Sequence, residues 1–129
     1  FKFVVAIHAR TSGYSANLFN TDYGQEYRNS NIDDLFLATD YIRDLGGICL
    51  RLGDKSMPKV RREGIIDYVH SDLKDELMDL YILERSDFFL ASATGMIVAA
   101  GEIGTPCAIY NVSPPSHIKA GFPNNLLIQ

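Results

Sequence analysis

Continuous apolar runs that alternate with helix-type patterns constrain the fold of this chain more than any other feature of its sequence. The run at residues 3–8 is rich in β-branched residues. Strands without polar alternation are typical of a parallel sheet that is covered on both faces. Similar short runs, each predicting a strand, occur at residues 48–52, 65–69, 88–91 and 107–111.

Helical patterns lie between these strands. In residues 31–45, apolar side chains recur at three- and four-residue spacing, Asn31 is a good N-cap, and a Gly-Gly pair ends the pattern. A second helix is expected to begin at a capping Ser71. A short apolar segment at residues 96–103 predicts a third helix. The buried stripe expected on the second helix consists of Leu73, Leu77, Leu80 and Tyr81.

Strands and helices that alternate over a short chain predict βαβ units with right-handed crossovers. The expected fold class is therefore α/β: a Rossmann-like three-layer sandwich with a mainly parallel sheet of about five strands. The length of 129 residues indicates a single domain, residues 1–129. Because the chain starts at Phe1 and enters a strand almost at once, we expect a domain cut from a longer protein. Residues 112–129 are expected to wrap the surface.

Composition excludes several classes of function. The chain is 47% hydrophobic with a formal charge of −4, which lacks the positive patch of a nucleic-acid binder. Its apolar runs are too short to span a membrane. Cys49 and Cys107 belong to no CxxC motif, which favours a reducing compartment. We expect a cytoplasmic protein, a location that includes the inner face of the membrane.

Polar residues collect after the predicted strands. Ligands of an open parallel sheet bind outside the carboxyl ends of its strands, so these residues should share one edge. A polar segment at residues 9–30 is long enough to be functional and to close over a ligand. The residues expected at the edge are His8, Arg10, Arg51, Gly53, Asp54, His70, Ser71, Ser92, Thr94, Gly95 and Asn111.

This edge suits a diphosphate. Arg10 and Arg51 each present a planar fork of donors that matches phosphate oxygens and keeps its charge. The turn at residues 92–95 precedes a helix, whose N–H groups and dipole favour an anion. Gly95 carries no Cβ, so a phosphate can approach the backbone closely.

Each of these residues also has a structural interpretation. Arg10 could form a surface salt bridge, His8 could be a satisfied core histidine, and His70 is expected to face solvent. Arg51, inside an otherwise apolar strand, requires a partner. The convergence of the residues favours an anion site more than any one of them does. A capping or local hydrogen-bonding role is the alternative for Asp67, Ser71, Ser92 and Thr94.

Other chemistries leave no signature. The chain has neither a G-x-x-x-x-G-K-[ST] nor a G-x-G-x-x-G motif. Its three histidines do not fall at metal-ligand spacing, and no D-x-D motif is present. The sequence therefore predicts no metal site and no bound cofactor.

Taken in order, the motifs resemble the carboxyl-terminal region of a family of bacterial glycosyltransferases associated with surface-polysaccharide genes. The resemblance covers about residues 7–111. The His8-x-Arg10 element also looks like the strand-end H-x-R of fucosyltransferase-type enzymes. The segments that carry the resemblance are His8-Ala9-Arg10 with Tyr14, Tyr27-Arg28-Asn29, Leu50-Arg51-Leu52-Gly53-Asp54, Ile66-Asp67-Tyr68-Val69-His70-Ser71, Leu77-Met78-Asp79-Leu80, residues 88–95 and Gly104-Thr105-Pro106.

The resemblance implies a metal-independent enzyme of GT-B architecture, in which the carboxyl-terminal domain holds the nucleotide-sugar donor. Arg10 would hold the diphosphate, and His8 would orient groups or handle a proton. The implied partners are a nucleoside-diphosphate sugar, a glycan or lipid-linked acceptor and an amino-terminal domain. The Glu that many GT-B enzymes place seven residues before the Pro of G-x-P is Ala99 here. The candidate binding residues are Arg10, Tyr14, Arg51, Gly53, Asp67, Ser71, Ser92, Thr94 and Gly95.

Two functional hypotheses follow. The first is the donor-binding domain of a glycosyltransferase that acts in polysaccharide or glycoconjugate synthesis. The second is a non-catalytic α/β module that binds a nucleotide or a protein through the same edge, with the tyrosine-rich loop as a contact surface. Nucleotide binding is compatible with both hypotheses, whereas sugar transfer separates them.

Overall fold

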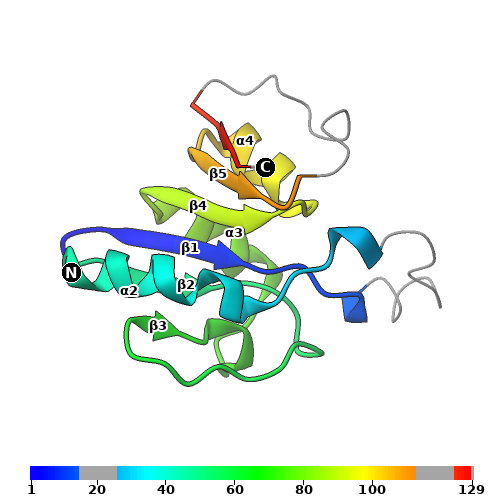
Figure 1. The fold of residues 1–129 in the computed structure, drawn as a ribbon, viewed down its shortest axis with the longest axis horizontal. Helices are drawn as coiled ribbons and strands as arrows, with labels where there is room; N and C mark the ends of the chain where they lie inside the picture. Colours follow the sequence, from blue (N-terminus) through cyan, green and yellow to red (C-terminus); the bar gives the residue numbers. More distant parts are fainter. Residues whose placement is uncertain (15–25, 113–123, 129) are drawn as a thin grey trace.

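A computed structural model describes residues 1–14, 26–112 and 124–128. These residues form a parallel sheet of six strands in the order β3-β2-β1-β4-β5-β6 (Figure 1). The fold is the expected Rossmann-like α/β sandwich, with one strand more than the apolar runs indicated. The strands are β1 (Val4–His8), β2 (Ile48–Arg51), β3 (Ile65–Ile66), β4 (Phe88–Ser92), β5 (Cys107–Tyr110) and β6 (Leu126–Leu127).

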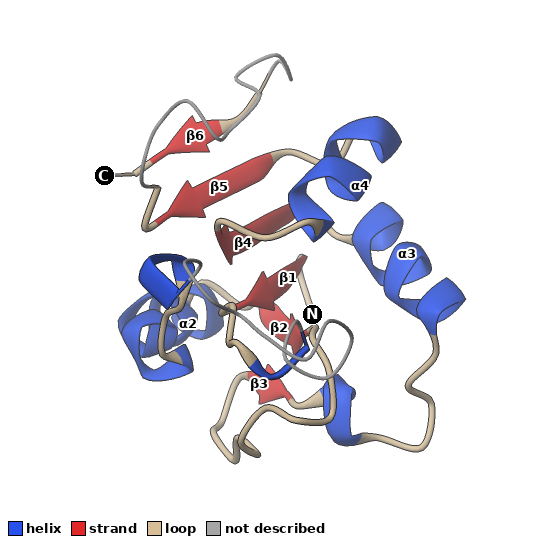
Figure 2. Ribbon diagram, turned by 90° about the vertical axis from the view of Figure 1, so that its right-hand side faces the viewer, coloured by secondary structure: helices blue, strands red, loops and turns tan. Residues whose placement is uncertain are grey.

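Helices cover both faces of the sheet. The helix α2 (Phe36–Asp44) lies on one face, and α3 (Glu76–Arg85) and α4 (Met96–Ile103) lie together on the other (Figure 2). The central strand β1 pairs with β2 at one edge and β4 at the other, and its side chains enter apolar clusters on both faces of the sheet. This position explains why the run contains no polar alternation before His8.

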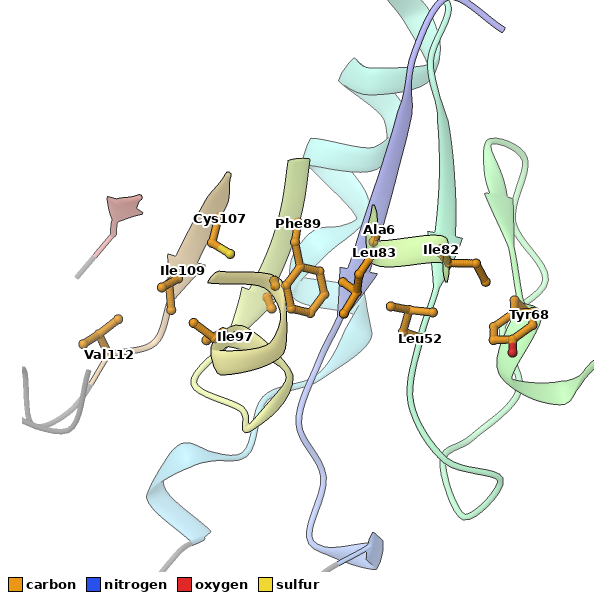
Figure 3. Packing of buried hydrophobic residues seen from close by; sticks show 12 residues of the cluster. Ala6, Leu52, Tyr68, Ile82, Leu83, Phe89, Ile97, Cys107, Ile109 and Val112 are labelled. Atoms are coloured by element: carbon orange, nitrogen blue, oxygen red, sulfur yellow. The ribbon is translucent and has the colours of Figure 1, made fainter. Parts of the chain in front are cut away.

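Two apolar clusters hold the layers together. Beneath α3 and α4, Ala6 and Phe89 of the strands pack with Leu83 of α3 and Ile97 of α4 (Figure 3). The opposite cluster forms around Val5, Ile7, Cys49 and Leu90 of the strands, together with Ile32, Leu35 and Ile42. Neighbouring residues of β1 therefore enter different clusters, as the alternation of side chains along a strand requires.

The first helical segment is confirmed, with a tighter start than expected. It opens as a 3₁₀ turn, η2 (Ile32–Leu35), before α2 begins. Asn31 is the N-cap: its Oδ1 accepts from the Asp33 N–H at 3.1 Å, and Asp34 Oδ2 accepts from the Asn31 N–H at 3.2 Å. The face expected to be buried comprises Ile32, Leu35, Phe36, Thr39, Ile42 and Leu45. Ile32, Leu35, Thr39 and Ile42 are buried, Phe36 is partly buried, and Leu45 is exposed.

The third strand is shorter than expected. Pairing with β2 ends at Ile66, and Tyr68–His70 form a 3₁₀ turn, η3, instead of continuing the strand to residue 69. Asp67 causes the change, because its carboxylate accepts hydrogen bonds from Arg51, the Val60 N–H and His70, which draws the chain out of the sheet.

For the second helix, the expected first residue and the expected buried face are both wrong. Ser71 does not cap it: the Ser71 hydroxyl donates to Tyr68 O at 2.8 Å, and Asp75 is the N-cap of α3 through the Leu77 N–H. Ile82 and Leu83 are the buried residues of α3. The expected stripe instead faces outward, and its exposed members are Leu73, Leu77, Leu80 and Tyr81.

The described part of the carboxyl-terminal region adds to the sheet. Leu126 and Leu127 pair with Ala108 and Ile109 of β5, and the Ile128 N–H donates to Ile109 O at 2.8 Å. The expected surface wrapping by residues 112–129 otherwise lies outside the described residues. Among the helices of the described ranges, none has the length and apolar character needed to cross a membrane.

Candidate functional site

The strand order reverses between β1 and β4. Strands β2 and β3 continue to one side of β1, whereas β4, β5 and β6 continue to the other. In open parallel sheets, ligands bind outside the carboxyl ends of the strands at such a point of reversal. The segments that follow β1 and β4 here are residues 9–11 and 93–95.

A hydrogen bond joins these two segments. The Arg10 N–H donates to Ser92 Oγ at 2.8 Å, between two buried residues. Ser92 therefore fixes the path of the chain at Arg10 and lies beneath the surface, rather than lining it as expected. The Arg10 guanidinium donates to Asn29 Oδ1.

Residues 28–30, called the strap from here on, cross the carboxyl ends of β1, β4 and β5. The Ser30 N–H donates to Arg10 O at 2.9 Å, and the Arg28 guanidinium donates to Ala93 O at 3.0 Å. Beyond β5, Asn111 Nδ2 donates to Asn29 O at 3.1 Å. The strap thus brings a second guanidinium, that of Arg28, to the turn before α4.

Ser30 also anchors the strap through its side chain. Its Oγ lies 2.9 Å from the Tyr110 hydroxyl oxygen. Burial raises the pKa of Tyr110, so this hydroxyl is protonated at neutral pH. Asn111 has a φ of 53°, a left-handed conformation that asparagine tolerates better than most residues. The end of β5 is therefore shaped to meet the strap.

The amino terminus of α4 has no side-chain cap. Gly95 is its N-cap, and no side-chain cap is present among the described residues. The Ile97 N–H donates to Thr94 O at 3.2 Å and the Val98 N–H to Gly95 O at 3.1 Å, and the first turn contains no acidic residue. Gly95 is exposed, and a Cβ built on it would find no heavy atom of the described residues within 4 Å. The positive end of the α4 dipole therefore faces accessible space beside Arg10 and Arg28.

The amino terminus of η2 differs in each of these respects. It carries a complete capping box, and Asp33 and Asp34 lie in its first turn. Its N–H groups have side-chain acceptors, and its acids repel an anion. Of the two helix starts at this edge, α4 is the one whose first turn carries no acidic residue.

His8 ends β1 in a buried position, at 5% exposure. Burial is the largest influence and lowers its pKa from 6.5 to about 4; Arg51 and Arg10 lower the pKa further, and Asp54 opposes them. His8 is therefore neutral at pH 7. Its Nδ1 is buried without a hydrogen-bond partner among the described residues.

Arg51 has the partner that its position requires. Its Nη1 donates to Asp67 Oδ1 at 3.1 Å and to Pro58 O at 2.6 Å. The pKa of Asp67 is lowered. Burial, the largest single influence, acts to raise this pKa, but hydrogen bonds from the Val60 N–H and His70, together with the charge of Arg51, outweigh the effect of burial. The guanidinium of Arg51 serves to fix the segment after β2, so Arg51 is not brought to the α4 start.

His70 was expected to face solvent, and this expectation is wrong. Its Nδ1 lies 2.8 Å from Asp67 Oδ2, and only 13% of its side chain is exposed. His70, Asp67 and Arg51 thus form a continuous polar chain at the carboxyl ends of β2 and β3.

Gly53 and Tyr14 lie on the same side of the edge. Gly53 has a φ of 147°, a backbone conformation that residues with a Cβ rarely adopt, so glycine is favoured at this position. A Cβ on Gly13 would lie 2.0 Å from Ser56 Oγ, which places the exposed Tyr14 beside the loop after β2.

The structure therefore divides the expected residues. It brings Arg10, Thr94 and Gly95 together at the reversal point, with His8 at the end of the strand beneath them. It assigns Ser92, Arg51, Asp67 and Ser71 to internal hydrogen bonds. Sequence reasoning gave no specific role to Arg28, Asn29 or Asn111, because only the folded chain brings the strap to β5. The part of the expected loop at residues 15–25 lies outside the described residues.

No group of three or more histidine, cysteine or acidic side chains in the described ranges is arranged to hold a metal ion. No protein-family model matches the chain, and neither curated proteins nor solved structures gave a match.

Proposed function

We propose that this chain binds the diphosphate of a sugar nucleotide at the α4 start and forms the donor-binding domain of a metal-independent glycosyltransferase. One observation carries the proposal: the α4 start, which has an exposed Gly95 and no side-chain cap in the described part of the chain, lies beside Arg10 and Arg28 at the reversal point of a parallel sheet. A diphosphate supplies the negative charge that the helix dipole and two guanidiniums favour.

The same arrangement suits the chemical step of sugar transfer. When the bond between the sugar and the diphosphate breaks, both electrons leave with the diphosphate oxygen. The N–H groups at the α4 start and the guanidiniums of Arg10 and Arg28 would stabilise this developing charge without a metal ion. The acceptor hydroxyl loses its proton, and we assign the group that takes it to a separate amino-terminal domain.

His8 has a different role from the arginines. With a pKa of about 4, it is neutral at pH 7, so it adds no third positive charge to the site. It is also a weak base at that pH. We assign it to orienting the residues at the end of β1 rather than to removing the acceptor proton.

The wider assignment rests on the family resemblance of the motifs. It comprises a glycan or lipid-linked acceptor, a second domain that completes the site, and a cytoplasmic location that includes the inner membrane face. We expect the 129-residue chain to bind a nucleotide without turnover; glycosyl transfer by this chain alone would contradict the two-domain assignment.

A binding assay on Gly95→Ala tests the proposal. Gly95 has a φ of −60°, and a Cβ there meets no neighbour, so alanine fits the fold. A methyl group at this position would instead obstruct a phosphate on the helix start. We expect an unchanged or higher melting temperature and at least about tenfold weaker binding of the best ligand among UDP, GDP, ADP and CDP, measured by calorimetry.

Two arginine variants complete the test. Arg10→Gln should weaken binding of the same ligand. Arg85→Ala, which changes the last residue of α3, should leave the affinity of the chain for that ligand unchanged. Failure of all four diphosphates to bind the wild-type chain would refute the proposal. Nucleotide binding to a full-length product that neither hydrolyses nor transfers a sugar would favour the non-catalytic module.

A further inference from the structure

A pocket of about 490 Å³ lies on the α2 side of the strap. It forms where three segments meet: residues 9–11 after β1, residues 29–34 at the start of η2, and the end of β2 with Pro58. Its volume lies within the range of small-molecule sites. The strap residues Asn29 and Ser30 form one of its walls.

The lining of this pocket combines polar groups with a larger apolar surface and offers no uncompensated positive charge. Thr11 and Ser30 contribute hydroxyl groups, Asn31 an amide, and Asp34 a carboxylate. The positive charge of the buried Arg51 side chain is paired with Asp67, whose Oδ1 lies 3.1 Å from Arg51 Nη1. The η2 start is capped and carries acids, so it disfavours phosphate. The pocket therefore suits a neutral ligand with several hydroxyl groups.

Two buried polar atoms lack partners at this place. Thr11 Oγ1 and Arg51 Nε are buried and have no hydrogen-bond partner among the described residues, and both side chains belong to the lining. Buried polar groups are nearly always hydrogen-bonded, and leaving one unpaired is costly. A hydroxyl-rich ligand supplies both the donor and the acceptor that such groups require.

Small apolar surfaces complete the lining. Ala9, Ile32 and Pro58 present carbon atoms next to the hydroxyl, amide and carboxylate groups. A sugar ring has the matching character, since its C–H groups lie between its hydroxyl groups. A carboxylate can accept from two adjacent hydroxyls at once.

We propose that this pocket binds adjacent hydroxyl groups of a sugar, with Asp34 as the acceptor. Ala9 and Thr11 flank Arg10, and Asn29 both lines the pocket and accepts from Arg10. The sugar pocket and the diphosphate site therefore share a wall. The identity of the sugar rests on the proposed function: it is either the ribose or the transferred hexose of a sugar nucleotide.

A matched pair of variants tests the role of Asp34. Asp34→Asn and Asp33→Asn remove the same charge from the same 3₁₀ turn, but only Asp34 lines the pocket. Asparagine keeps an oxygen acceptor for the Asn31 N–H. We expect Asp34→Asn to weaken binding of UDP-glucose or GDP-mannose, whichever binds the wild type, by about tenfold relative to Asp33→Asn.

Thr11→Val adds a readout that separates binding from folding. Valine keeps the shape of threonine and removes a buried hydroxyl that has no hydrogen-bond partner in the described part of the chain. We expect an unchanged or raised melting temperature together with about threefold or greater loss of affinity for the same ligand. A stable variant that keeps full affinity, combined with equal effects of Asp33→Asn and Asp34→Asn, would overturn the inference.

The ligands distinguish the two sources of the sugar. If the ribose occupies the pocket, Asp34→Asn weakens UDP or GDP as much as the sugar nucleotide, and the 2′-deoxy diphosphate binds the wild type more weakly. If the hexose occupies it, Asp34→Asn weakens only the sugar nucleotide.

The pocket is tested separately from the proposed function. If Gly95→Ala weakens the diphosphates while Asp34→Asn matches Asp33→Asn, the diphosphate site stands and the sugar pocket fails. If no nucleotide binds, glucose and mannose are titrated alone, with the amide signals of Thr11, Ser30 and Asn31 followed by NMR. Shifts of these signals that Asp34→Asn abolishes support the pocket; no shift at 100 mM sugar, a concentration of the order at which millimolar affinities saturate, overturns it.

Discussion

Arg51 shows what a single residue reveals before the fold is known. An arginine in an apolar strand needs a partner, and this much follows from its sequence context. The identity of the partner does not follow from the sequence, because Asp67 reaches Arg51 only after the chain between them has folded back beside β2. The same holds for His70, whose contact with Asp67 depends on the 3₁₀ turn η3.

Replacing either Arg51 or Asp67 should lower the free energy of unfolding, and replacing both should lower it by less than the sum of the two single losses. Arg51→Met leaves the largely buried Asp67 carboxylate, 13% exposed, without the guanidinium of Arg51, and we expect a loss of about 3 kcal/mol in the free energy of unfolding. Asp67→Asn should cost a similar amount. Urea unfolding of both variants and of the double variant gives the coupling, and additive losses would contradict an energetic link between the residues.

Stability should fall as the pH drops below neutral because of His8. Its folded-state pKa of about 4 lies below the ordinary value of 6.5, so the unfolded chain takes up the proton first. Its contribution is therefore present above pH 6.5 and is lost as the pH falls towards 4. We expect a loss of about 2 kcal/mol between pH 7 and pH 5, measured by urea unfolding. In His8→Gln, this part of the pH dependence should disappear; equal slopes in both proteins would argue against a buried neutral histidine.

Helix α3 illustrates what a sequence pattern leaves undetermined at the scale of an element. Apolar residues occur on more than one side of this helix, so spacing identifies possible faces without choosing between them. The crossover from β3 to β4 makes the choice by directing Ile82 and Leu83 towards the sheet. The late start at Glu76 has a similar cause, because the Tyr68 hydroxyl receives the Asp75 N–H at 3.0 Å and holds the preceding segment in a loop.

Two leucines of α3 should therefore respond very differently to truncation. Leu83 is fully buried, and Leu83→Ala should lower the free energy of unfolding by about 2–5 kcal/mol. Leu77 is 74% exposed, and Leu77→Ala should change the free energy of unfolding by less than about 0.5 kcal/mol. Chemical denaturation of the two variants checks the orientation of the helix; a larger loss at Leu77 would reverse it.

At the scale of the whole molecule, the apolar runs predict a parallel sheet covered on both faces, and the structure confirms it. The sequence patterns do not predict the sixth strand, because β6 consists of only two residues, Leu126 and Leu127. The convergence of strand-end residues at one edge follows from parallel topology alone. The strap does not, because it depends on contacts between residues about 80 positions apart, for which single-sequence patterns carry no signal.

The edge strand β6 should protect β5 from pairing with another molecule. Removing residues 124–129 would free the edge of β5 that now pairs with Leu126 and Leu127. We expect lower stability and concentration-dependent association, detected by light scattering. Leu126→Thr, which keeps the backbone pairing, is the control and should remain dispersed. A truncated chain that stays monomeric at every concentration would show that β6 has no such role.

The strap also implies an order of assembly. Its anchors are Tyr110, the last residue of β5, and Asn111, the next residue, whereas the strap itself lies between β1 and α2 in the sequence. Contacts with such long sequence separation form only after the intervening chain has been organised. The strap, which borders the proposed diphosphate site, is therefore among the last regions to become ordered during folding. By the same reasoning, it should be among the first to open in the native protein, and amide hydrogen exchange at Ser30 should be faster than at Ile7.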